Sequence, residues 1–363
     1  MWFFVCLGIY VFFPFEQKFL YFFLYFFLNL LKNYTIYGII APNVDRNIER
    51  TIIMIEFFNA TLGQLITLFG VLLVGYFLKK KDILPDNSDR AFSRLLAWAA
   101  SPALCFRTFS NNFKIENMAT NLGLIITGTI VLLVSFLIAK IISPSFSKGD
   151  SYLNNIYLYS FTISNLGYMG YPITQAVFGD EAMFHMMIFC VPLQVFIYSF
   201  GLAMLNPVNK KITFRSLINP IFASMILGAL FGVFNISLPG TLSSIVSMFA
   251  DSMSFLAMIV TGFTIAKFPL KDMLSDPKIY IASFLRLVVI PAIIVSAIIL
   301  LKLPKTYVIS ALCSLAMPLG LNTVIFPASY GGDTRPGASM ALISTFAALI
   351  TIPLMFAVFG GSL

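Results

Sequence analysis

Long apolar runs alternate with short polar segments along residues 61–359. A membrane helix needs about 20 mostly apolar residues, whereas a membrane β-barrel shows segments of about 10 residues with alternating polarity. The pattern therefore predicts an all-α polytopic membrane protein. Ten transmembrane helices are expected, at residues 61–78, 90–109, 118–142, 152–178, 181–205, 216–236, 240–266, 279–301, 306–330 and 337–359.

The composition also indicates that the apolar runs lie in lipid. Of the 363 residues, 59% are hydrophobic and 10% are charged, whereas a soluble domain carries about 25% charged residues. The net charge of +8 does not indicate a nucleic-acid partner, because Lys and Arg lie in short clusters between the apolar runs. The lipid bilayer is the expected environment, and nucleic acid is not an expected partner.

The clustered basic residues predict an orientation, because cytoplasmic loops carry an excess of Lys and Arg. The segments after spans 1, 3, 5, 7 and 9 hold fourteen basic residues, namely Lys79, Lys80, Lys81, Arg90, Arg94, Lys140, Lys148, Lys210, Lys211, Arg215, Lys267, Lys271, Lys278 and Arg335. The opposite side holds four, namely Arg107, Lys114, Lys302 and Lys305. We therefore expect a multi-pass protein of the cell membrane (inner or plasma membrane), with residue 54 and the C-terminus on the non-cytoplasmic side.

Residues 1–53 differ from the rest of the chain. An aromatic-rich stretch up to Leu31 is followed by a polar, unpatterned segment that ends near Arg50. No basic segment precedes the apolar stretch and no small-residue cleavage site follows it, so a signal peptide is not indicated. Two interpretations remain open: an extra membrane segment, or an N-terminal extension upstream of a start at Met54.

Three landmarks recur at a nearly constant offset, one of them Gly179-Asp180, which recurs as Gly332-Asp333, 153 residues later. The Leu84-Pro85 pair recurs as Leu238-Pro239, 154 residues later, and the segment at Asn165 recurs at Pro318, 153 residues later. Five spans in each half force the second half to enter the membrane upside down, an arrangement typical of secondary transporters. The expected organisation is an extension at 1–53, a first five-helix repeat at 54–206, a cytoplasmic linker at 207–215 and a second, inverted five-helix repeat at 216–363.

Spans 4 and 9 are interrupted at matching positions of this repeat. Both place Gly, Pro and Asn in mid-membrane, where proline removes a backbone donor and a freed backbone group is costly unless it finds a partner or lines a cavity. A simple proline kink is the alternative. We expect instead that both helices unwind, that they cross, and that each second half-helix points its N-terminus at an anionic group. The candidate substrate-binding residues are Ser164, Asn165, Gly167, Pro172, Pro318, Gly320, Asn322 and Thr323.

Three charged residues within or beside the spans are candidates for coupling or for lining a vestibule. Asp251 is an intramembrane carboxylate, which is usually functional, although it could equally be a structural partner. Arg286 could snorkel to the cytoplasmic surface or attract substrate, and Arg107 could line the outer vestibule. The cysteines show no metal-ligand spacing and the chain has one histidine, so no cofactor, metal site or catalytic residue is expected. Gln175 and Gln194 are weaker candidates.

Residues 54–363 resemble the auxin efflux carrier family of membrane transporters, which includes bacterial organic-anion permeases and, more distantly, the plant PIN-FORMED auxin carriers. The matching stretches are Leu73 to Tyr76, Leu84-Pro85, Ser101 to Leu104, Ser164 to Pro172, Ala316 to Thr323, Tyr330 to Asp333 and Leu342 to Pro353. The stretch across spans 9 and 10 is the most specific of these.

The resemblance implies a ten-helix fold of two inverted five-helix repeats. It implies a scaffold domain (spans 1, 2, 6 and 7) and a transport domain (spans 3–5 and 8–10) that moves like an elevator, with the substrate where spans 4 and 9 cross. Asn165 matches the crossover asparagine and Pro318 the crossover proline. In the plant carriers the two crossovers are more alike, whereas here Pro172 follows Asn165 and Pro318 precedes Asn322, so the residue that marks each crossover is left open. The family also suggests a homodimer through the scaffold.

The expected function is secondary transport of a small organic anion such as a carboxylate, with protons or Na⁺ as a candidate coupling ion. A cation antiporter or symporter of similar fold should carry acidic residues at the crossover, and none lies there. An enzyme would need clustered acid–base, metal or nucleophilic groups, which the spans lack. A non-transporting membrane sensor is a further alternative.

Overall fold

The computed structural model describes residues 44–206, 220–330 and 332–360. The chain forms two compact units, Met1–Thr51 and Ile52–Leu363, and most of the first lies outside the described residues. Within the described ranges the chain is helical and contains no strand; the only β-type pairing there is a single antiparallel bridge between Ser164 and Leu319.

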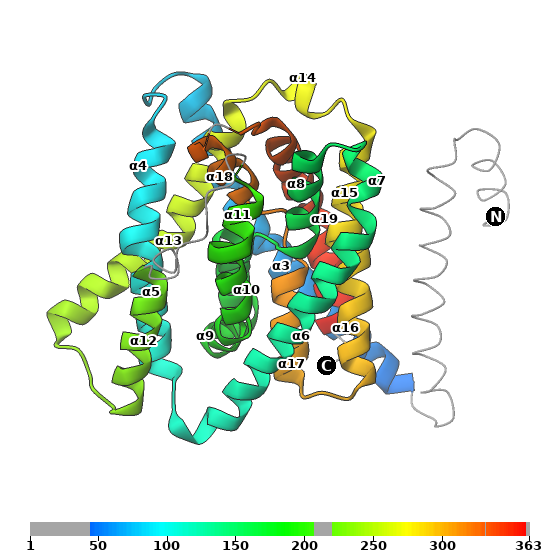
Figure 1. Cartoon of the computed structure of the whole chain (residues 1–363). Helices are drawn as coiled ribbons and strands as arrows, with labels where there is room; N and C mark the ends of the chain where they lie inside the picture. The colour runs from blue at the N-terminus through cyan, green and yellow to red at the C-terminus, as the bar shows by residue number, and fades with distance from the viewer. Residues whose placement is uncertain (1–43, 207–219, 331, 361–363) are drawn as a thin grey trace. The chain divides into compact units, whose positions relative to one another are not determined.

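Long apolar helices alternate with helices that are built from shorter pieces (Figure 1). The uninterrupted long helices are α3 (Val44–Lys80), α6 (Met118–Ile142), α13 (Gly240–Ala266) and α19 (Arg335–Gly360). The shorter helices between them include α4 (Ser88–Leu95), α5 (Ser101–Asn112), α7 (Pro144–Ser147), α12 (Pro220–Val233), α14 (Leu270–Met273), α15 (Pro277–Phe284) and α16 (Ile290–Leu300). One π-helical turn, Leu96–Ala100, joins α4 to α5, and another, Leu285–Val289, joins α15 to α16.

Five stretches of the described chain are long and apolar enough to cross a membrane, and a sixth follows if a bent helix pair is one span. They are Phe57–Lys80, Ile115–Ile142, Gly240–Ala266, Pro277–Leu300 and Arg335–Gly360. This confirms a multi-pass helical membrane protein. The remaining expected spans consist of shorter helical pieces, so ten spans in two inverted repeats stay a prediction.

Several element boundaries agree with the hydrophobic pattern. The runs at 118–142 and 240–266 coincide with α6 and α13. The segments at 152–178 and 181–205 are separated within α9 (Tyr171–Phe189), where Gly179 adopts φ 87° and the helix kinks. Met54 lies inside α3, which continues through it without a break. The rest of the expected extension, residues 1–43, and the linker at 207–215 fall outside the described residues.

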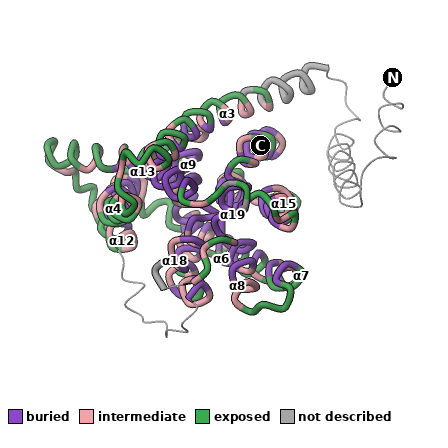
Figure 2. Tube along the Cα trace, turned by 90° about the horizontal axis from the view of Figure 1, so that it is seen from above, coloured by how far each residue is buried: buried purple, intermediate pink, exposed green. Residues whose placement is uncertain are grey.

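The helices of the larger unit pack in two groups (Figures 1 and 2). In the first group α5 contacts α12 and α13, and α3 closes on α13. A Cβ at Gly262 would lie 1.9 Å from the Leu72 carbonyl oxygen, and a Cβ at Gly75 would lie 2.4 Å from that of Ile259. Glycine at both positions therefore permits a backbone approach of the kind seen between membrane helices.

The second group surrounds the interrupted helices. In it α6 contacts α8 (Ser151–Thr162), α9 and α10 (Val191–Phe196), α9 contacts α17 (Lys305–Leu315), and α15 contacts α19. The outward face of α6 carries a helically spaced apolar stripe of exposed side chains at Ile126, Ile130, Leu133, Leu137 and Ile141. Such a stripe suits contact with lipid tails.

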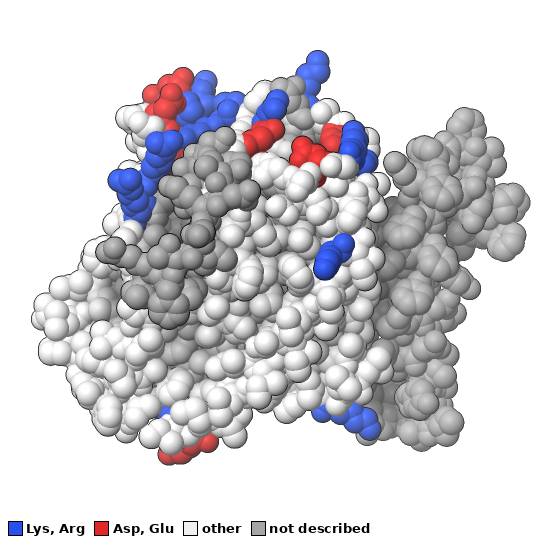
Figure 3. Space-filling model, viewed as in Figure 1, with Lys and Arg blue, Asp and Glu red and all other residues white. Residues whose placement is uncertain are grey.

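Charged side chains gather at the two ends of the face shown in Figure 3, and the surface between them is almost entirely uncharged. At the end where α3 meets α4, Lys79 lies 2.8 Å from Asp82 and 2.9 Å from Asp86, and Lys267 at the end of α13 lies 2.7 Å from Asp89. Hydrogen bonding from Lys79 lowers the pKa of the Asp86 carboxyl below its usual value. Basic segments after different helices thus lie together at one end.

Candidate functional site

Two helices break and meet at the same place. Helix α8 ends at Thr162, after which Ile163 is extended, and a π-helical turn, Leu166–Gly170, leads into α9. Helix α17 ends at Leu315, and α18 (Asn322–Tyr330) resumes after six residues without regular helix. The two breaks pair as antiparallel backbone, with the Asn165 N–H donating to the Pro318 carbonyl oxygen at 2.7 Å.

Serine hydroxyls satisfy further backbone groups at the crossing. Ser164 donates to the carbonyl oxygen of Ser314 at 2.5 Å, near the end of α17. The hydroxyl of Ser344 on α19 accepts the N–H of Leu319 at 3.0 Å. All four residues are buried. These backbone groups, freed by the breaks, therefore have partners, which an interrupted helix inside a membrane requires.

Arg286 supplies one more of these contacts. Its Nη1 donates to the Leu315 carbonyl oxygen at 2.8 Å, at the C-terminal end of α17, and its side chain is 1% exposed. A cation suits a helix C-terminus, where the partial charge is negative. Arg286 does not snorkel to the surface, because this contact draws it into the protein, and it does not line the cavity described next.

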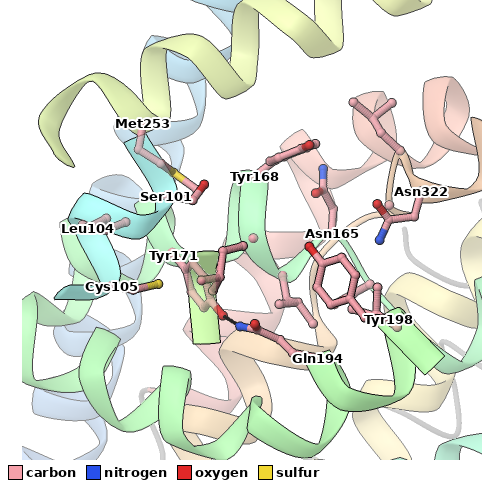
Figure 4. A pocket seen from close by; sticks show the side chains of 17 residues that line it. Ser101, Leu104, Cys105, Asn165, Tyr168, Tyr171, Gln194, Tyr198, Met253 and Asn322 are labelled. Carbon is pink, nitrogen blue, oxygen red and sulfur yellow. Dashed lines mark hydrogen bonds between the residues drawn. The ribbon is translucent and has the colours of Figure 1, made fainter. Parts of the chain in front are cut away.

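A cavity of about 90 Å³ lies beside the crossing (Figure 4). This exceeds the roughly 10–15 Å³ that one water molecule needs. One wall comes from the broken helices and from α10 with the turn that follows it, and the other from α5, α12 and α13. The lining residues are Ser101, Leu104, Cys105, Ser164, Asn165, Leu166, Gly167, Tyr168, Tyr171, Gln194, Ile197, Tyr198, Ile221, Met253, Gly320, Leu321 and Asn322.

The cavity lies where the two helix groups face each other. Ser101 and Met253 come from the first group, and Asn165 and Asn322 come from the second (Figure 4). The cavity therefore lies between helices that would have to slide past each other if one group moved against the other.

The polar groups of the cavity are amides and hydroxyls. Asn165, 5% exposed, stands at the start of the turn that leads into α9, and Asn322 is the first residue of α18. The Asn322 side-chain amide donates to the Tyr159 hydroxyl at 2.9 Å. No acidic or basic residue belongs to the lining as the structure describes it. Two helix starts, whose first N–H groups have no intrahelical acceptor, thus open toward an uncharged cavity.

Gln194 forms the floor of the cavity with Tyr171. Its Nε2 donates to the Tyr171 hydroxyl at 2.5 Å, and both side chains are 4% exposed. Its Oε1 is buried and has no hydrogen-bond partner among the described residues. Figure 4 shows this pair beside Tyr198.

The structure brings five of the predicted binding residues to the cavity: Ser164, Asn165, Gly167, Gly320 and Asn322. The other three, Pro172, Pro318 and Thr323, are buried outside the described lining. Pro318 acts through its carbonyl, and the Thr323 hydroxyl donates to the Gly320 carbonyl oxygen at 3.0 Å.

Sequence reasoning missed the aromatic part of the lining. Tyr168 and Tyr171 follow Asn165 at spacings that place them on one side of the helical turn, and Tyr198 lies four residues after Gln194. That helical spacing of polar aromatic and amide side chains beside a break was the available signal.

The predicted coupling residues Arg107 and Asp251 form an ion pair away from the cavity lining. Arg107 Nη1 lies 2.7 Å from Asp251 Oδ1 and links α5 to α13, and the Asp251 side chain is 68% exposed. Asp251 is therefore a partner of Arg107 within the first helix group, and Arg107 is not a free vestibule cation.

Proteins with similar sequences carry names that describe them as transporters. The family described as "Membrane transport protein" matches residues 60–215 and 207–356. An "Uncharacterized transporter YfdV" of Escherichia coli K12 is 20% identical over 312 residues, which cover 83% of this chain and 97% of the relative. An "Uncharacterized transporter" of Methanothermobacter thermautotrophicus is 21% identical over 307 residues, 82% of this chain and 98% of the relative. The chain therefore belongs to the membrane transport protein family, the auxin efflux carrier family that its sequence resembles.

Proposed function

We propose that this protein is a secondary transporter of small organic anions, such as carboxylates, that binds its substrate at the crossing of the two broken helices. The observation that carries the proposal is the cavity at Asn165 and Asn322, where two helix starts and two amides meet without a formal charge. Helix N-termini favour negative groups through their free N–H donors and their partial positive charge.

An uncharged site suits reversible binding of an anion. A buried cation at the site would carry its own desolvation cost and would remain unpaired whenever the site is empty. Amides and backbone N–H groups avoid that cost, so the empty site can cross the membrane as well as the loaded one. The cavity lining provides such donors at Asn165 and Asn322 and an apolar wall at Leu104, Ile197 and Met253.

The proposed architecture is ten spans in two inverted repeats, residues 54–206 and 216–363, joined by a linker at 207–215. Its support is the constant sequence offset and the pairing of Ser164 with Leu319 at equivalent breaks. The first helix group, α3 to α5 with α12 and α13, would be the scaffold. The second group would be the transport domain, and its elevator-like sliding would carry the cavity across the membrane.

The proposed setting is the cell membrane, with the basic end cytoplasmic and residue 54 and the C-terminus on the other side. Protons or Na⁺ are the proposed coupling ions, with Asp251 a candidate proton site through its pair with Arg107. A homodimer through the scaffold is proposed from the family resemblance. A cation antiporter or symporter is disfavoured because the described cavity lining holds no carboxylate to bind a cation. No observation favours a non-transporting sensor.

The test is transport by the purified protein in liposomes, with a panel of radiolabelled carboxylates of different size and charge. We expect uptake of at least one member, and we expect Asn165→Ala to lower its rate by about tenfold or more, the effect of losing one strong hydrogen bond to a charged group. Asn111→Ala, which alters an exposed asparagine outside the cavity, is the matched control. Normal transport by Asn165→Ala would show that the substrate binds elsewhere.

A further inference from the structure

Gln194 lines the cavity, and its side-chain oxygen is a buried acceptor that receives no hydrogen bond from the described residues. Gln194 is 4% exposed, its Nε2 donates to the Tyr171 hydroxyl, and its Oε1 has no partner among the described residues. A buried acceptor without a partner costs about 1–3 kcal/mol. A hydrogen-bond donor from outside the described side chains would therefore stabilise this oxygen.

We propose that Gln194 determines specificity by accepting a hydrogen bond from the substrate, and that the substrate is a carboxylate that also carries a hydroxyl or N–H donor. The inference rests on the proposed function, because it assigns the second polar end of the same anion. The carboxylate would lie at the helix starts near Asn165, and the donor would reach Gln194 Oε1.

Hydrogen-bond chemistry places the carboxylate of the ligand near Asn165 and its donor group near Gln194. A carboxylate offers only acceptor oxygens at neutral pH and would be repelled by Gln194 Oε1. A hydrocarbon chain placed there would leave the acceptor buried and unpaired. A donor on the ligand would satisfy it, and a site built to accept such a bond rejects the analogue that lacks the donor.

The geometry holds the amide in place. Gln194 lies on α10, and its partner Tyr171 lies at the start of α9, beside the break at Asn165. The contact therefore connects the Gln194 amide to the same backbone segment that carries the proposed anion site. Ile197 and Tyr198, one turn further along, continue the wall, so the donor-bearing end of the ligand would lie along this helix face.

Matched pairs of carboxylates that differ by a single hydroxyl test the inference in proteoliposomes: lactate with propionate, malate with succinate, and 4-hydroxyphenylacetate with phenylacetate. The measurement is the ratio of initial uptake rates within each pair. In every pair that the protein transports, we expect the hydroxylated member to be preferred by about tenfold, which corresponds to about 1.4 kcal/mol.

Gln194→Leu replaces the amide by an apolar side chain of similar size, which removes the acceptor and also the donor to Tyr171. We expect it to bring the ratio to about one, chiefly by improving transport of the member without the hydroxyl. Gln175→Leu is the matched control, because Gln175 lies on the neighbouring helix α9, its Nε2 donates to Asp180 at 2.7 Å, and it is not part of the cavity lining. If Gln194→Leu does not fold, Gln194→Glu retains an acceptor and should keep the preference at a lower overall rate.

The outcomes separate the two proposals. Uptake of no carboxylate by the wild-type protein would overturn the proposed function and this inference with it. Uptake without preference within the pairs, preference for the member without the hydroxyl, or a preference that Gln194→Leu leaves unchanged would overturn the inference and leave the function standing.

Discussion

The backbone N–H of Asn165 and the carbonyl oxygen of Pro318 form a hydrogen bond of 2.7 Å between two helix breaks that are 153 residues apart in sequence. The break at Asn165 leaves a backbone donor without a helical acceptor, and the break at Pro318 leaves a backbone acceptor without a helical donor. Because both groups would be costly in hydrocarbon if left alone, each break stabilises the other. The paired breaks therefore form one structural unit.

Removing the Ser344 hydroxyl should destabilise this unit. In Ser344→Ala the Leu319 N–H loses its acceptor, at 3.0 Å in the wild type, in a fully buried position. An unsatisfied buried donor costs about 1–3 kcal/mol, so the melting temperature in detergent should fall by several degrees. Ser252→Ala is the control, since the exposed Ser252 donates only to a carbonyl of its own helix. Equal melting temperatures for the two variants would show that another group replaces the hydroxyl.

Much of this unit could be predicted from the sequence. Gly, Pro and Asn in the middle of apolar runs located both breaks, and the offset between them indicated that they are equivalent. The bounds of α6 and α13 followed from hydropathy alone, because both helices are continuous. Where a helix is continuous and apolar, composition determines its ends, and where it is broken, the missing backbone partners mark the site.

The remaining contacts depend on how the helices pack. Arg107 and Asp251 are 144 residues apart and meet only because α5 packs on α13. Arg286 was expected near the surface or near the substrate, and the end of α17 instead draws it into the interior. The tyrosines of the cavity and the free oxygen of Gln194 are defined by the directions of side chains across several helices, which a single sequence does not show.

Arg286 should be required for an intact crossing. Arg286→Met removes the donor to the Leu315 carbonyl and the positive charge at the end of α17. We expect loss of most transport together with a lower melting temperature, while Arg286→Lys, which keeps the charge, should recover part of both. Lys305→Met, which removes a cation at the opposite end of the same helix, is the control. Full activity of Arg286→Met would mean that the carbonyl is satisfied without it.

Because α3 and α13 approach closely, replacing glycine by alanine should destabilise the protein at the contact between them and not elsewhere on α3. Gly262→Ala should destabilise the protein by about 1–3 kcal/mol, because the new Cβ would lie 1.9 Å from the Leu72 carbonyl oxygen and would force the helices apart. Gly70→Ala, on α3 with no atom within 4 Å of the added Cβ, should be neutral or slightly stabilising, because alanine favours the helix. Thermal unfolding of both variants in the same detergent measures the difference. A stable Gly262→Ala protein would contradict the packing of α3 on α13.

The ion pair of Arg107 and Asp251 provides the test of coupling. If Asp251 carries the coupled proton, Asp251→Asn should abolish the response of transport to a pH gradient while substrate exchange at equal pH continues. If Asp251 serves only to hold α5 against α13, Asp251→Asn should lower the melting temperature and leave the pH response intact. Arg107→Gln separates the two roles further, because it breaks the same 2.7 Å contact but keeps the carboxylate. A pH response lost in Asp251→Asn and retained in Arg107→Gln would assign the proton to Asp251, whereas a response retained in both would place coupling elsewhere.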